Sequence, residues 1–155
     1  MIQRTTVLLA ALAIATVGIA APAGANEACH TINATGTGQD VGGFATVAQI
    51  RDGGLLQGTT AAQFVPGDLI GGVLPFTGDI VFTTNRATLT VGLSGMFDLG
   101  TGFFSATGPV TGATGKLSGA TGTLEFEGIQ NFLDGTFTET VNGEICVDLG
   151  GNGKR

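Results

Sequence analysis

Two glutamates near the C-terminal end of the chain could perform acid–base chemistry together. Glu125 and Glu127 are two residues apart, so in a β-strand both side chains lie on one face. Two carboxyl groups placed together could act as the acid and base of a glycoside hydrolase. They alternate with Leu124 and Phe126, which predicts that the apolar side chains face the interior and both carboxylates face solvent.

Glu139 is a different kind of carboxylate, because the other residues on its face are apolar. In an extended segment it shares that face with Phe137 and Val141. If the face is interior, Glu139 is a buried acid with a raised pKa, and it becomes the candidate catalytic residue of the chain. A β-bulge would instead turn the side chain outward.

The remaining residue types leave little room for other catalytic centres. His30 is the single histidine, so a metal site or a Ser-His-Asp triad would depend on it, and we interpret it as a strand-edge side chain. Gly115-Lys116 is similar to the end of a phosphate-binding P-loop, but Val110 and Leu117 stand where that motif requires Gly and Ser or Thr. We predict no metal and no cofactor.

The two cysteines, Cys29 and Cys146, lie near the two ends of the expected mature domain. In an exported protein an even number of cysteines indicates a disulfide, and we predict that these two are bonded. The alternative is a redox or nucleophilic thiol, for which His30 is the only nearby partner in the sequence.

The N-terminal residues have the organisation of a secretory signal peptide. Arg4 supplies a positive charge, residues 7–20 are apolar, and Ala23-Gly24-Ala25 resembles a cleavage site. We therefore predict a signal peptide over residues 1–25 and a mature domain that is secreted, either extracellular or periplasmic. The alternative is a permanent N-terminal anchor.

Charge excludes some classes of partner. The chain has twelve acidic and six basic residues, a formal net charge of −6, and its basic residues form no patch apart from the terminal pair Lys154-Arg155. Phosphate backbones and anionic lipid heads are repelled by such a surface, so we predict no nucleic-acid partner and no membrane association after cleavage. The sequence does not define the oligomeric state.

The composition predicts an all-β domain over residues 26–149, followed by a flexible tail at 150–155. Only 12 % of residues are charged, 28 are glycine, and threonine supplies much of the polar surface. The clearest strand is 87–99, in which apolar and polar residues alternate along its length. The predicted strands, bounded by glycine, proline and asparagine turns, cover residues 29–35, 41–50, 55–65, 77–84, 87–99, 103–110, 122–132, 136–141 and 144–149.

Eight or nine strands at hairpin spacing, with no room for crossover helices, favour a small closed antiparallel β-barrel or a sandwich. A barrel removes exposed sheet edges, which a chain poor in lysine and proline has few other means of protecting. With about eight strands, its lumen is filled by side chains or holds one small ligand.

Two copies of Gly-Ala-Thr-Gly, at residues 112–115 and 119–122, form a sharp corner that leads into a long strand. The segment 110–126 resembles the part of the plant allene oxide cyclase barrel where a strand ends, a glycine-rich corner follows and a new strand begins. Secreted bacterial relatives of those barrels and of the dirigent proteins have similar sequences. The resemblance extends over residues 97–144 and implies a small antiparallel barrel with an apolar, aromatic pocket.

The apolar face of the strands predicts what would line the lumen. The simplest interpretation is that these side chains fill the lumen completely as a core. The alternative is that they surround a cavity for a small hydrophobic molecule, which is bound without turnover. The family resemblance implies a further alternative, a cyclase, isomerase or dirigent-like protein that templates ring closure or coupling; a structural or surface-interaction module is the remaining one. We predict the ligand-binding residues Phe82, Leu89, Val91, Leu93, Phe97, Phe104, Phe126 and Phe137.

Overall fold

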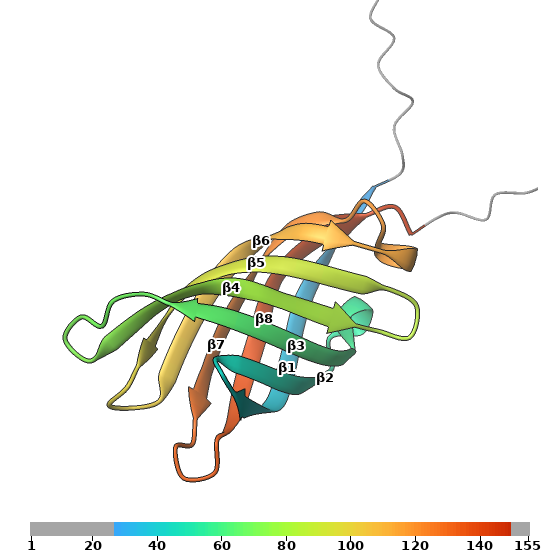
Figure 1. The fold of residues 1–155 in the computed structure, drawn as a ribbon. Coiled ribbons are helices and arrows are strands. Elements are labelled where there is room, and N and C mark those ends of the chain that lie inside the picture. Colours follow the sequence, from blue (N-terminus) through green and yellow to red (C-terminus); the bar gives the residue numbers. More distant parts are fainter. Residues whose placement is uncertain (1–26, 150–155) are drawn as a thin grey trace, which may run out of the picture.

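The computed structural model describes residues 27–149, which fold into a closed antiparallel barrel of eight strands (Figure 1). The predicted signal peptide at 1–25 and the predicted tail at 150–155 lie outside the described residues. The strands are β1 (Ala28–Gly42), β2 (Ala45–Arg51), β3 (Gly58–Pro66), β4 (Val73–Thr83), β5 (Thr88–Asp98), β6 (Phe103–Ala113), β7 (Thr121–Gln130) and β8 (Thr136–Val147).

Each strand pairs with the next one along the chain, and β8 pairs back with β1, which confirms the predicted barrel. The connections therefore alternate between its two ends. We call the end with the β1–β2, β3–β4, β5–β6 and β7–β8 connections the mouth, and the opposite end the closed end. Among the described residues, no helix has the length and apolar character needed to cross a membrane.

Two predicted turns prove to be strand interior, and the second of them merges the last two predicted strands into β8, which gives eight strands in place of nine. Gly36-Thr37-Gly38 lies within β1, and Asn142-Gly143 lies within β8. At Gly143 a Cβ would overlap the backbone oxygen of Thr123 on the neighbouring strand. These glycines permit close approach between strands instead of reversing the chain.

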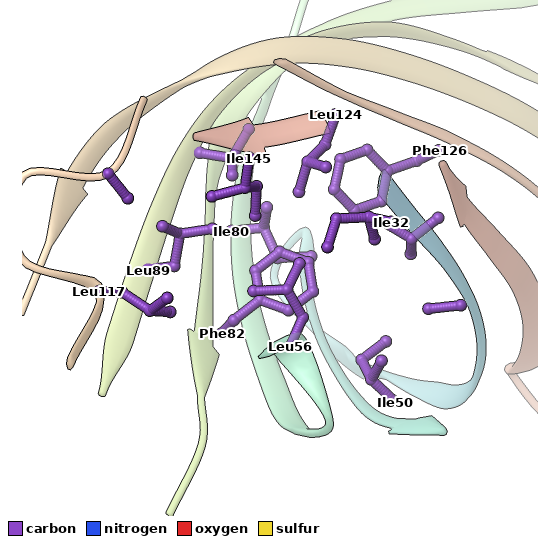
Figure 2. Packing of buried hydrophobic residues seen from close by; sticks show 14 of the residues in the cluster. Ile32, Ile50, Leu56, Ile80, Phe82, Leu89, Leu117, Leu124, Phe126 and Ile145 are labelled. Carbon is purple, nitrogen blue, oxygen red and sulfur yellow. The ribbon is translucent and has the colours of Figure 1, made fainter. Parts of the chain in front are cut away.

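The half of the lumen near the closed end is packed solid. The connection from β2 to β3 contains the 3-10 turn η1 (Gly54–Leu56), and the connection from β6 to β7 contains η2 (Gly115–Leu117). Each turn inserts one leucine, Leu56 or Leu117, into this end of the barrel, where both are buried (Figure 2). They join an apolar cluster in which Phe82, Leu89 and Ile145 are fully buried.

The double Gly-Ala-Thr-Gly segment builds the corner that carries Leu117. Its first copy ends β6 and enters η2 at Gly115, where φ is +60° and a Cβ would overlap the backbone oxygen of Arg86. Its second copy leads into β7, as predicted. Glycine at position 115 is therefore required both by the left-handed backbone and by the close approach.

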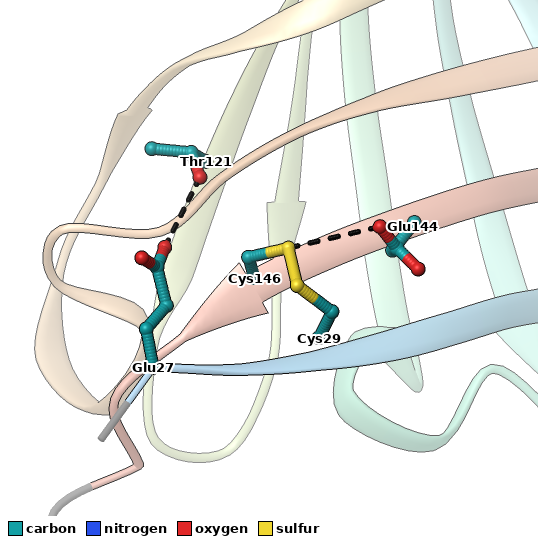
Figure 3. The surroundings of a disulfide bond; sticks show 5 residues. All are labelled: Glu27, Cys29, Thr121, Glu144 and Cys146. Carbon is teal, nitrogen blue, oxygen red and sulfur yellow. Dashed lines mark hydrogen bonds between the residues drawn. A yellow bond between two sulfur atoms is a disulfide. The ribbon is translucent and has the colours of Figure 1, made fainter.

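A disulfide between Cys29 and Cys146 joins the first strand to the last (Figure 3). The two cysteines are direct partners in the β1–β8 ladder, and the Oε1 of Glu144 lies 3.8 Å from the sulfur of Cys146. Nearby, the Thr121 hydroxyl donates a hydrogen bond of 3.2 Å to Glu27 Oε1. The predicted pairing is confirmed, and a bond of this kind is typical of proteins in an oxidising compartment.

We expect the disulfide to contribute to stability without determining the topology. It closes a long loop, with a sequence separation of 117 residues, and so restricts the unfolded chain strongly. Replacing both cysteines, as in Cys29→Ser with Cys146→Ser, should lower the free energy of unfolding by about 2–4 kcal/mol in urea titrations. Reducing agent should have the same effect on the wild type and none on the double variant; equal stability with and without the bond would contradict this expectation.

Candidate functional site

The half of the lumen near the mouth is hollow. It contains a cavity of about 290 Å³ that opens at the mouth, close to the lower end of the range for small-molecule sites. Its wall is mainly aromatic and aliphatic. The lining residues are Asp40, Phe44, Ala45, Thr46, Thr60, Phe64, Pro66, Leu74, Phe76, Ile80, Leu93, Phe97, Leu99, Phe104, Ala106, Phe126, Gln130, Phe132, Phe137 and Glu139.

The cavity stays open because aromatic rings in its wall lie over glycines of the neighbouring strand. Phe137 of β8 is paired with Gly38 of β1, and a Cβ at Gly38 would overlap the Phe137 ring. The same cross-strand arrangement occurs three more times, in the pairs Phe64 with Gly78, Phe76 with Gly95, and Phe104 with Gly128. Each ring occupies the volume that a neighbouring side chain would otherwise fill, so bulky residues cover the wall without filling the centre.

Contacts between rings fix these side chains further. Phe64 and Phe76 pack edge-to-face with ring centroids 5.0 Å apart, and Phe104 packs in the same way on Phe137 at 5.8 Å. Such pairs prefer this geometry and contribute about 0.5–1.5 kcal/mol beyond the area they bury. The cavity wall is therefore formed in advance of any ligand.

The mouth carries many exposed apolar side chains. Phe44 is 56 % exposed, Ile70 is 71 % exposed and Leu133 is 97 % exposed, and each belongs to a different connection at this end. Phe44 also has a left-handed φ of 59°, an unusual conformation for a bulky residue and one that is frequent at functional sites. An apolar molecule approaching the cavity would meet apolar surface first.

Glu139 brings a carboxyl group into the apolar wall. It points inward from β8, is only 8 % exposed, and pairs with Gly36 on one side and Gly128 on the other. A Cβ at Gly36 would lie 2.7 Å from Glu139 Oε1, so the flanking glycine makes room for this carboxyl group. The Oε1 atom is buried and has no hydrogen-bond partner among the described residues. Burial raises the pKa of Glu139 from its ordinary value of 4.5 to about 7.

The predicted lining residues fall into two groups. Leu93, Phe97, Phe104, Phe126 and Phe137 line the cavity together with Glu139. The other three, Phe82, Leu89 and Val91, are fully buried in the packed half near the closed end, and we correct their assignment from ligand contacts to core.

Sequence reasoning missed several wall residues, most notably Phe64 and Phe76. Phe64 lies two residues before Pro66, and Phe76 directly follows Pro75, so both segments looked like strand ends or corners. The signal that could have found them is their pairing with Gly78 and Gly95. That pairing becomes visible only when the strand register is known.

The other candidates for chemistry do not form a site. Glu125 and Glu127 are exposed on the outer face of β7, as predicted. His30 faces inward near the closed end, and its buried Nε2 atom has no hydrogen-bond partner within residues 27–149. In that same part of the chain, the one cluster of potential metal ligands is Cys29, Glu144 and Cys146, whose two sulfur atoms are bonded to each other and offer no thiolate.

Comparisons with protein-family models, with curated proteins and with solved structures found no match for this chain.

The buried carboxyl group should make stability depend on pH. Burial favours the neutral acid, so the folded chain retains a proton that the unfolded chain releases between about pH 4.5 and 7. The resulting stabilisation is complete at acidic pH and is lost as the pH rises through about 7. Between pH 5 and pH 8 we expect the wild type to lose about 2–3 kcal/mol of unfolding free energy relative to Glu139→Gln in urea titrations.

The matched control for this experiment is Glu125→Gln, which makes the same chemical change on the exposed face. In this control, the change in unfolding free energy between pH 5 and pH 8 should be the same as in the wild type. If Glu139→Gln behaves in the same way as this control, Glu139 does not titrate as a buried acid.

Proposed function

We propose that this protein is an exported barrel that binds one small hydrophobic molecule in its lumen, without chemical turnover. The observation that carries the proposal is the preformed apolar cavity at the mouth, in a barrel whose other half is packed solid. If the lumen served only as a core, the inward residues would be expected to fill both halves.

Two further features support binding. The exposed apolar residues around the mouth offer a route of entry for a water-insoluble molecule. The resemblance of residues 97–144 to allene oxide cyclase-like barrels implies an aromatic pocket in a small antiparallel barrel. Export, proposed from the signal-peptide pattern of residues 1–25, agrees with the Cys29–Cys146 disulfide.

Binding can be tested with prodan, a neutral fluorescent naphthalene whose emission shifts to the blue in apolar surroundings. We expect a saturable shift with one probe per chain. Ala106 lines the cavity and is 9 % exposed, so Ala106→Leu adds volume to the lumen. This variant should weaken prodan binding by about tenfold or more, because the added carbons occupy the ligand's space.

Ala28→Leu is the matched control, because it makes the same change on an exposed residue at the closed end. It should bind prodan as the wild type does. If the folded wild type gives no saturable shift, the lumen is not a binding site for such molecules, and the structural or surface-interaction alternative takes its place.

A second candidate function, an isomerase or cyclase, is favoured by one observation. The cavity contains a carboxyl group whose pKa, raised by burial to about 7, is suited to moving protons at neutral pH. In that case incubation with an apolar epoxide or enone should yield an isomer of unchanged mass, and Glu139→Gln should abolish its formation while prodan still binds. Isomer formation at the wild-type rate in Glu139→Gln would exclude this role for the carboxyl group.

A further inference from the structure

The cavity wall contains one deeply buried ionisable group, and its position bears on the class of ligand. Glu139 is more than nine-tenths buried, lines the cavity and has no hydrogen-bond partner for Oε1 within the described part of the chain. An unpaired buried polar atom is costly, so its presence in a cavity wall indicates a partner that the protein itself does not provide.

The charges at the mouth have the same sign as this carboxylate. In residues 27–149, the four ionisable side chains nearest that end are all acidic: Asp40, Asp68, Asp98 and Asp134. Hydrogen bonds from the hydroxyl and backbone N–H of Thr136 lower the pKa of Asp134, which keeps it charged. Three of these aspartates also accept hydrogen bonds from backbone N–H groups in their turns, so they have a structural role as well.

The basic residues lie elsewhere in the part of the chain that the structure describes. Arg51 ends β2, Arg86 lies between β4 and β5, and Lys116 lies in η2, all at the closed end. Among residues 27–149, no lysine, arginine or histidine lines the cavity. The charges that the described residues place at the mouth are therefore all negative, and they attract cations and repel anions.

We propose that the cavity binds a small apolar molecule with one basic nitrogen, and that the protonated nitrogen donates a hydrogen bond to the carboxylate of Glu139. This proposal rests on the proposed function, since it specifies the ligand of the same cavity. The carboxyl group has already lost its hydration in the free protein, so an incoming ammonium group completes a buried ion pair of which one half is in place. A fatty acid would bring a second negative charge to the same position.

The proposed ion pair between the ammonium group and Glu139 predicts how binding depends on pH. The residues that flank Glu139 from β1 and β7 are Gly36, Gly38, Phe126, Gly128 and Gln130, none of which titrates. Among the described lining residues the one other titratable group is Asp40, near the mouth, to whose Oδ2 the Gln130 side chain donates a hydrogen bond of 3.4 Å. The affinity for an amine should therefore follow Glu139 alone and fall by about tenfold from pH 8 to pH 6, as the carboxylate takes up a proton.

Three molecules with one carbon skeleton test the proposal: 3-phenylpropylamine, 3-phenylpropan-1-ol and 3-phenylpropanoic acid. Their affinities are measured by displacement of prodan from the full mature chain and by calorimetry, at pH 6 and pH 8. At pH 8 we expect the amine to bind about tenfold or more tightly than the alcohol, because hydrogen bonds to charged groups are stronger than neutral ones. The acid should bind least, and the affinity of the alcohol should not fall between pH 8 and pH 6.

Glu139→Gln should reduce the affinity for the amine to that for the alcohol and remove its pH dependence, with prodan binding retained. Glu125→Gln, the same change on the exposed face, should leave all three affinities unchanged. Prodan binding combined with equal or reversed affinities for amine and alcohol would overturn the head-group assignment while the proposed function stands. If neither prodan nor any of the three molecules binds, the proposed function itself fails.

Discussion

The pairing of β1 with β8 is the constraint on which the rest of the structure depends. It aligns residues from the two ends of the domain, from Ala28 with Val147 to Gln39 with Thr136. Without this seam the remaining strands would form an open sheet with two exposed edges and a single apolar face. With it, every inward side chain faces a common interior, so the contents of the lumen are determined by residue size at each level of the barrel.

Residue size divides that interior into two halves with different properties. Toward the closed end, inward leucine, isoleucine and valine residues interdigitate, and the two 3-10 turns supply Leu56 and Leu117 as end plugs. Toward the mouth, phenylalanines alternate across the strands with glycines, and the rings cover the wall. The packed core and the open cavity thus occupy separate parts of one small barrel. Burying the carboxyl group of Glu139 in the hollow half costs free energy, and the apolar packing of the other half offsets this cost.

Much of the fold could be predicted from local patterns, because a period of two and a turn every ten residues or so are properties of short segments. The alternation in β5 and the outward direction of Glu125 and Glu127 follow from such patterns, whereas the disulfide follows from the cysteine count and the expected export. The roles of several glycines could not be predicted from local patterns. Gly36 and Gly38 looked like a turn, whereas their role depends on Glu139 and Phe137, which are distant in sequence. The depth of a residue in the lumen is equally non-local: Phe82 and Phe104 are both inward residues of strands, but only the arrangement of the connections shows which end is plugged.

The seam between β1 and β8 has a consequence for how the chain could be rearranged. Because the first and last strands are hydrogen-bonded neighbours with a covalent link, residues 27 and 149 both lie at the closed end, and the barrel has no intrinsic starting strand. A short linker between these ends, with new termini cut into the β4–β5 connection, would give a circular permutant with the same cyclic order of strands. For the same reason, a partner domain fused to either natural end of the barrel would be attached at the pole opposite the mouth. The protein could thus be immobilised or displayed with its cavity facing outward.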